Sequence, residues 1–236
     1  MLVKVRLASN HAYIISGSKN VQSIFRSAKN LSFDVEFFQI LQRVYGLPKA
    51  DAALLCGNSP AECKRTVHRL EKLYAAHLAN PRATSSLIGH FLETYTEELD
   101  TFENNEWTEV ELNAFLRQAM SKAAISALVG PSIFEKSPSF AEDYWQFDAG
   151  FKSLLYGMPT LLCRKETLAR DRVLGKMKSF VTGAWNGADW KDEQKIDADW
   201  EPGFGSRMVR ELEKFLHELG ISVDGRASME LSLIFA

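Results

Sequence analysis

The sequence lacks the patterns that identify several common functional classes. It has three cysteines, Cys56, Cys63 and Cys163, and no CxxC spacing. It therefore predicts neither a disulfide framework nor a structural zinc site, and a reducing compartment is the simpler expectation. The five histidines show no HExxH or other paired spacing, so no metal ligand is predicted among them. The formal net charge of -2 leaves no basic excess that would favour nucleic acid as a partner.

Motifs for phosphate transfer and covalent hydrolysis are also missing. Gly203 and Gly205 lack the spacing and the strand-to-helix setting of a nucleotide-binding loop. There is no GxSxG, and no cysteine stands in a recognised nucleophile setting. The start, MLVKVRLASNHAY, lacks the apolar core of a signal peptide and a membrane-spanning run of about 20 residues.

What the sequence does contain is an ordinary globular balance, with 46% hydrophobic and 25% charged residues. Alternating apolar and basic residues at the start predict one β-hairpin, and nearly everything after it has helical period. Capping boxes mark three helix starts, Ser59 with Glu62, Thr108 with Glu111, and Ser139 with Glu142. The predicted regions are a hairpin over 1–17, a helical region over 18–182, a loop over 183–205, and a helix plus the start of another over 206–236.

Three tryptophans stand in the predicted loop, Trp185, Trp190 and Trp200. They could anchor a partner, but we expect them to hold the loop against its own protein. Two other features look unfinished. The hairpin has no later strands to extend it, and the apolar segment MELSLIFA starts a helix that stops after barely two turns. We therefore expect a single incomplete domain that packs loosely in isolation.

One stretch, Ala123 to Val181, carries a family resemblance. Its elements are Leu128-Val129-Gly130-Pro131, Phe147-Asp148-Ala149-Gly150-Phe151 and Gly157-Met158-Pro159. The stretch resembles the middle of the cytochrome P-450 superfamily, in particular the branch of sterol 7-alpha-hydroxylases, prostacyclin synthase and their fungal relatives. Weaker similarity extends to both ends, so the resemblance covers nearly all of this chain and about half of a full-length member.

The resemblance implies a mainly α-helical fold, the amino-terminal half of a haem-thiolate monooxygenase, truncated at the start of its long central helix. The parent oxidoreductase would use haem iron, dioxygen and a redox partner to oxidise a hydrophobic, sterol- or lipid-like substrate. The family's haem-ligand loop, FxxGxxxCxG, does not occur here, and none of the three cysteines matches it. We therefore expect no catalytic residue in this chain and no haem held by a thiolate. Family members usually reach the endoplasmic reticulum membrane through an amino-terminal anchor, which these residues do not show.

By position in the family, two groups of residues become candidates for a site. The variable loop over the haem would span Phe37 to Leu55. Substrate-pocket candidates are Leu47, Phe147, Phe151, Leu154 and Leu155, although each could equally be a core residue. Haem-propionate candidates are Lys64, Arg65 and His68. The family's WxxxR pattern is absent from their helix, so a solvated basic face is the favoured alternative for them.

Three hypotheses follow for the function. The first is the fragment of a haem monooxygenase described above, inactive by itself. The second is a non-catalytic helical interaction or lipid-binding protein derived from the same fold. The third and weakest is a self-contained helical enzyme unrelated to haem.

Overall fold

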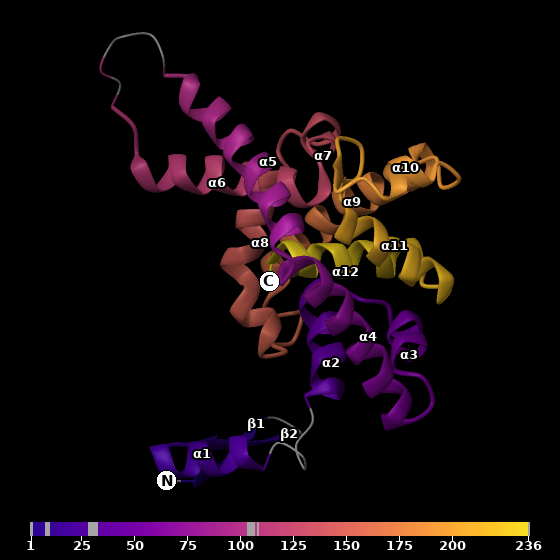
Figure 1. Ribbon diagram of the computed structural model, residues 1–236. Helices are drawn as coiled ribbons and strands as arrows, with labels where there is room; N and C mark the ends of the chain where they lie inside the picture. Colours follow the sequence, from indigo (N-terminus) through magenta and orange to yellow (C-terminus); the bar gives the residue numbers. More distant parts are fainter. Residues whose placement is uncertain (1, 8–9, 28–32, 103–106, 108, 236) are drawn as a thin grey trace. The chain divides into compact units, whose positions relative to one another are not determined.

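A computed structural model describes residues 2–7, 10–27, 33–102, 107 and 109–235, and it is mainly helical (Figure 1). The predicted fold class is thereby confirmed. The chain divides into two compact units, Met1–Phe37 and Phe38–Ala236, which are described one at a time below.

The first unit contains the predicted β-hairpin. Strand β1 (Leu2–Leu7) pairs in antiparallel fashion with β2 (Asn10–Ile15), and within the described residues this sheet has two strands. The second strand begins at Asn10. Helix α1 (Ser18–Arg26) follows and has no buried residue; the side chain of Phe25 is 77% exposed.

The second unit is an array of helices with one small hairpin. Three pairs of elements make its largest contacts: α8 with α9, α5 with α6, and α12 with α9. Within the described ranges no helix is long and apolar enough to cross a membrane. The elements are α2 (Asp34–Tyr45), α3 (Lys49–Cys56), α4 (Pro60–Leu78), α5 (Pro81–Asp100), α6 (Leu112–Val129), α7 (Ser132–Lys136), α8 (Phe140–Leu155), α9 (Arg164–Gly187), α10 (Glu193–Ile196), β3 (Trp200–Glu201), β4 (Gly205–Ser206), α11 (Arg207–Glu218) and α12 (Val223–Phe235).

Helix α12 lies at the centre of this unit. Every residue of Gly225–Leu231 is buried, and the helix packs against α6, α9 and α11. It begins at Val223, six residues before the Met229 at which the sequence predicted a helix start. The reason is a cap: the Ser222 hydroxyl accepts a hydrogen bond from the Gly225 amide at 3.1 Å, while the Asp51 carboxylate on α3 accepts the Ser222 amide at 2.9 Å.

The three predicted capping boxes have different outcomes. Ser59 caps α4 as predicted, accepting from the Glu62 amide at 3.3 Å. Ser139 precedes α8 as predicted, but its hydroxyl accepts from Lys176 instead of capping the helix. The box of Thr108 with Glu111 predicted the wrong capping residue. Helix α6 begins at Leu112, and the Glu111 carboxylate is the cap, accepting hydrogen bonds from two backbone amides. Thr108 lies outside the described residues.

The segment 183–205, predicted as one loop, contains regular structure. Helix α9 continues to Gly187, because its buried stripe of Met177, Phe180 and Val181 extends one more turn to a buried Ala184. Helix α10 and the two-residue strands β3 and β4 follow. The sequence prediction failed here because elements this short leave too few residues to show a period.

The tryptophans of this segment contact their own protein, as predicted. The Trp200 Nε1 donates to the backbone oxygen of Ala127 at 2.9 Å, and its ring stacks on His90 at 3.8 Å. The Trp190 Nε1 donates to the backbone oxygen of Trp185 at 3.0 Å. These contacts attach the segment to α5, α6 and α9.

The range Phe37–Leu55, likened to a variable loop, is largely helical in α2 and α3. The spacing of the apolar residues explains why this range is helical. Phe38, Leu41, Val44 and Tyr45 recur at helical spacing and are all buried. The region therefore presents ordered helical side chains to the rest of its unit.

Candidate functional site

Five aromatic rings from three separate chain segments meet in the second unit. We call them the aromatic cluster: Tyr45 at the end of α2, Tyr144, Phe147 and Phe151 on α8, and Phe235 at the end of α12. Phe235 stacks on Phe151 at 4.7 Å between ring centroids and meets Phe147 edge-on at 5.4 Å. Tyr45 lies 5.9 Å from Phe235 and 6.0 Å from Phe147. Figure 1 shows the carboxyl end of α12 beside α8.

The spacing of α8 places its contribution on one face. Phe147, Phe151 and Leu154 follow at intervals of four and three, which is the repeat of one helical stripe. Phe147 and Leu154 are buried and Phe151 is half-buried. Gly150, three residues after Phe147 and four before Leu154, borders this stripe and lets α9 approach closely, because an added Cβ would lie 2.6 Å from the Glu166 side chain. The rings of this stripe contact Tyr45 of α2 and Phe235 of α12.

Two phenol groups give the cluster its polar atoms. Burial, with a smaller contribution from Asp148, raises the pKa of Tyr144 to about 12. Burial, with a smaller contribution from Tyr144, raises the pKa of Tyr45 as well. An ordinary phenol is already neutral near pH 7 and can donate a hydrogen bond, and the raised pKa values extend this state to higher pH.

The structure brings together only some of the predicted pocket residues. Phe147 and Phe151 belong to the aromatic cluster, and Leu154 lies on the same face of α8. Leu47 is buried just after α2, and Leu155 is half-buried at the last residue of α8. The assignment of all five to a substrate pocket stays a prediction.

Sequence reasoning missed three members of the cluster. Tyr45 was hidden in a range likened to a loop, and Phe235 stood in a helix start without an assigned role. Tyr144 precedes Phe147 by three residues on α8, a spacing that would have placed both on neighbouring positions of one face. The helical repeat was therefore a usable signal for Tyr144 and Tyr45, whereas the contact with Phe235 depends on tertiary packing.

The three haem-propionate candidates share an exposed face of α4. Lys64, Arg65 and His68 are all exposed, and the Nδ1 of His68 lies 3.5 Å from a carboxylate oxygen of Glu71. Residues spaced by three and four lie on the same side of a helix, so Lys64 and Arg65 are both neighbours of His68. The arrangement suits either a bound carboxylate or a solvated basic face, and their role stays a prediction.

The cysteines do not fit the iron ligand of a haem-thiolate site. Such a ligand needs a thiolate with an open side toward the metal. The Sγ atoms of Cys56 and Cys63 lie 3.2 Å apart, in contact with each other. The buried Cys163 donates to the backbone oxygens of Met158 and Pro159. Nor do the described residues contain a group of three His, Cys, Asp or Glu side chains placed to hold a metal.

A second notable group is buried and charged. Arg226 on α12 donates to the Glu213 carboxylate on α11 at 2.8 Å, and Glu230, one turn further along α12, is also fully buried. The Arg226 guanidinium also lies 4.7 Å from the ring centroid of Trp185 on α9. Tyr74 of α4 lies close enough to Glu230 for its own pKa to be raised, chiefly by burial and then by that carboxylate. We call Glu213 and Glu230 the buried acid pair, and Arg226 is the cation beside them.

The buried acid pair takes up protons more readily than exposed carboxylates do. Burial raises the pKa of Glu213 to about 7, although Arg226 and a hydrogen bond with Glu230 oppose the shift. Burial and the neighbouring Glu213 raise the pKa of Glu230 well above its usual value. Both oxygens of Glu230 and one of Glu213 find no donor elsewhere in the described protein. A proton on Glu230, donated toward Glu213, supplies the missing donor.

Comparison with known proteins gives one consistent result. The chain is 29% identical to the cytochrome P-450 monooxygenase calL of Penicillium decumbens, over 99% of this chain and 46% of the relative. It is 26% identical to the cytochrome P-450 monooxygenases efuG of Hormonema carpetanum and fsoE of Humicola fuscoatra, over 99% of this chain and 42% and 41% of those proteins. The chain thus spans under half the length of these fungal relatives. No family model matches it, and no solved structure does.

Proposed function

We propose that this chain forms the substrate-facing part of a haem-dependent monooxygenase that oxidises a hydrophobic, sterol- or lipid-like molecule. The observation that carries the proposal is the aromatic cluster, in which α2, α8 and α12 supply rings to one place. Similarity to cytochrome P-450 monooxygenases along 99% of the chain supports the reaction class. The resemblance to the sterol 7-alpha-hydroxylase and prostacyclin synthase branch supports the substrate class.

The chemistry of the cluster suits such a ligand. Sites for small hydrophobic molecules are mostly apolar, with a few polar groups that fix orientation. Phe147, Phe151 and Phe235 supply the apolar surface. Tyr45 and Tyr144 would supply hydroxyl donors for a ligand oxygen.

Haem, its thiolate and the redox partner would come from outside this chain. When bound, haem would supply the activation of dioxygen, and Lys64, Arg65 and His68 would neutralise its propionates. The groups that carry out the reaction would lie outside this chain, so the chain by itself would be inactive. Membrane association would likewise belong to the parent protein.

Ligand binding by the purified 236-residue chain tests the substrate-facing role. A fluorescent sterol and a fluorescent fatty acid are titrated into the wild type, Phe151→Ala and Tyr156→Ala. Loss of one aromatic contact, worth about 0.5–1.5 kcal/mol, should weaken sterol binding by Phe151→Ala about two- to tenfold. Tyr156, exposed just after α8, is the matched control and should bind like the wild type. Equal affinity in all three proteins, or no binding, would contradict the proposal.

Haem addition separates the remaining alternatives. The chain is mixed with haemin, reduced and exposed to carbon monoxide. We expect no thiolate-type Soret band, and a clear one would overturn the claim that the thiolate comes from elsewhere. The competing function is a non-catalytic lipid-binding or interaction protein. It would be favoured if the chain binds the sterol but the coding sequence downstream of it contains no in-frame FxxGxxxCxG.

A further inference from the structure

Two cysteines lie in direct contact at the corner between α3 and α4. Cys56 is the last residue of α3, and Cys63 lies in the first turns of α4. Their Sγ atoms are 3.2 Å apart. A disulfide bond is about 2.05 Å long, so the two sulfurs must approach by about 1.2 Å to reach bonding distance.

The backbone between the two thiols is already held in place. Gly57 has a φ of 63°, and an added Cβ there would lie 2.3 Å from the Glu62 carboxylate. The same carboxylate accepts the Asn58 amide at 2.7 Å, and Ser59 caps α4 by accepting the Glu62 amide. The corner thus holds the two side chains facing each other, which reduces the entropy lost on closing a bond between them.

The third cysteine provides an internal contrast. Cys163 is buried at the start of α9, and its thiol donates to the backbone oxygens of Met158 and Pro159 at 3.3 and 3.4 Å. Cys63 is equally buried, but its contact is a second sulfur, and Cys56 is half-buried, with part of its surface open to solvent. The contact between Cys56 and Cys63 therefore combines a neighbouring thiol with access for a small oxidant, whereas the site of Cys163 does not.

We propose that Cys56 and Cys63 form an oxidation-sensitive dithiol that a peroxide converts into a disulfide. The Cys56 thiolate attacks one peroxide oxygen, the O–O bond breaks, and the products are a sulfenic acid and water. The Cys63 thiolate then attacks the sulfenic sulfur and expels a second water. In total, two thiols lose two electrons and two protons, and hydrogen peroxide is reduced to two molecules of water. The new bond would tie the end of α3 to the start of α4.

The linkage is tested on the folded, fully reduced 236-residue chain. The protein is treated with hydrogen peroxide while folded, then unfolded in urea that contains N-ethylmaleimide to block every free thiol, and the mass is measured. Three cysteines should give three adducts before oxidation and one afterwards, on Cys163, and dithiothreitol should restore all three. Cleavage after Glu62, between the two cysteines, should leave two pieces joined through sulfur. Three adducts after oxidation, or a dimer between chains, would overturn the proposal.

Variants and a denatured control show whether the folded corner is responsible. Cys163→Ser should keep the linkage, whereas Cys56→Ser and Cys63→Ser should each abolish it. In urea the same oxidation should be at least about tenfold slower, because closing the loop then costs the entropy that the folded corner has already lost. An equal or faster rate in urea would contradict the role given to the folded contact. The oxidised wild type should also melt a few degrees higher than the reduced form, and Cys163→Ser should show the same shift.

Discussion

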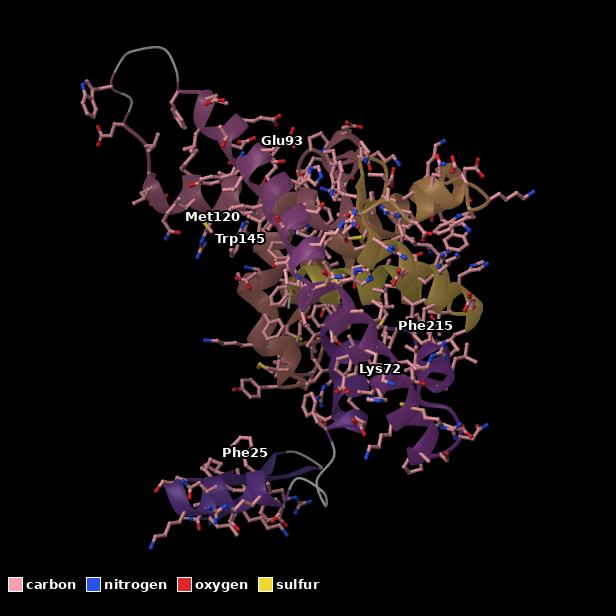
Figure 2. All side chains as sticks on the ribbon, viewed as in Figure 1. Phe25, Lys72, Glu93, Met120, Trp145 and Phe215 are labelled. Carbon is pink, nitrogen blue, oxygen red and sulfur yellow. The ribbon has the colours of Figure 1, made fainter. Side chains whose placement is uncertain are left out.

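Helices α5 and α12 have different surroundings although both carry apolar side chains. In α5, all of whose residues are described, no residue is buried, and the apolar side chains of Ile88, Leu92 and Leu99 are exposed. Glu93, labelled in Figure 2, lies on the same helix and is exposed too. In α12, by contrast, Gly225–Leu231 is buried without a break, charged residues included.

The difference teaches that neighbours decide burial more than composition does. Helix α5 contacts α4 and α6, while α12 is packed against α6, α9 and α11. A surrounded helix has no side that faces water, so its polar residues must find partners inside the protein. Arg226 does so through Glu213, and Glu230 does so through a shared proton. On α5 the corresponding interactions stay at the surface, as in the ion pair of Arg82 with Asp199.

Removing one ion pair from each helix gives the largest expected contrast. Arg226→Ala leaves two buried carboxyl groups without their cation and should lower the free energy of unfolding by about 3–5 kcal/mol. Arg82→Ala breaks a pair in which the arginine side chain is 83% exposed and should cost about 0–1 kcal/mol. Urea unfolding of both variants measures the difference. If Arg226→Ala does not fold, Arg226→Met, of similar length, measures the loss of charge alone. Losses of equal size would refute the comparison.

The buried acid pair should also make stability depend on pH. The folded pKa of Glu213, about 7, and that of Glu230, raised by burial and by the neighbouring Glu213, both exceed the unfolded value of 4.5. The folded state therefore binds more protons, and stability should fall as pH rises from about 4.5 through 7, by up to about 1.4 kcal/mol per pH unit and group.

Glu211 acts oppositely in acid: burial alone would raise its pKa, but hydrogen bonds from His77 and Arg207 lower it. Its contribution is present above pH 4.5 and is lost as the pH falls further.

A glutamine substitution isolates this effect. Glu230→Gln keeps the shape and can donate its amide toward Glu213, but it does not titrate, so the decline between pH 5 and 8 should become shallower. Glu97→Gln, at an exposed position of α5, is the matched control and should keep the wild-type slope. Urea unfolding at a series of pH values provides the measurement. A wild-type stability that is flat across this range would remove the basis for the shared proton.

The sequence predicted the elements better than their contacts. The hairpin, the mainly helical class and the Ser59 cap follow from local period and capping chemistry, and the structure contains all three. The start of α12 was missed because its cap, Ser222, is positioned by Asp51, which is distant in the sequence. The same limit applies to the site. The stripe on α8 was readable, but its meeting with Phe235 requires the packing of α8 against α12.

A surface substitution on α5 should have the smallest effect of all. Leu92 is 53% exposed although it stands in an apolar stripe, so the sequence alone predicts a core position and a cost of several kcal/mol for Leu92→Ser. The structure instead predicts a change within about 0.5 kcal/mol, because little apolar surface leaves a packed environment. Leu231→Ser on α12, at a fully buried position, serves as the comparison and should cost several times more. A large loss of stability for Leu92→Ser would show that another protein surface covers α5 in solution. The difference in burial between α5 and α12 would then reflect the absence of that surface from the structure.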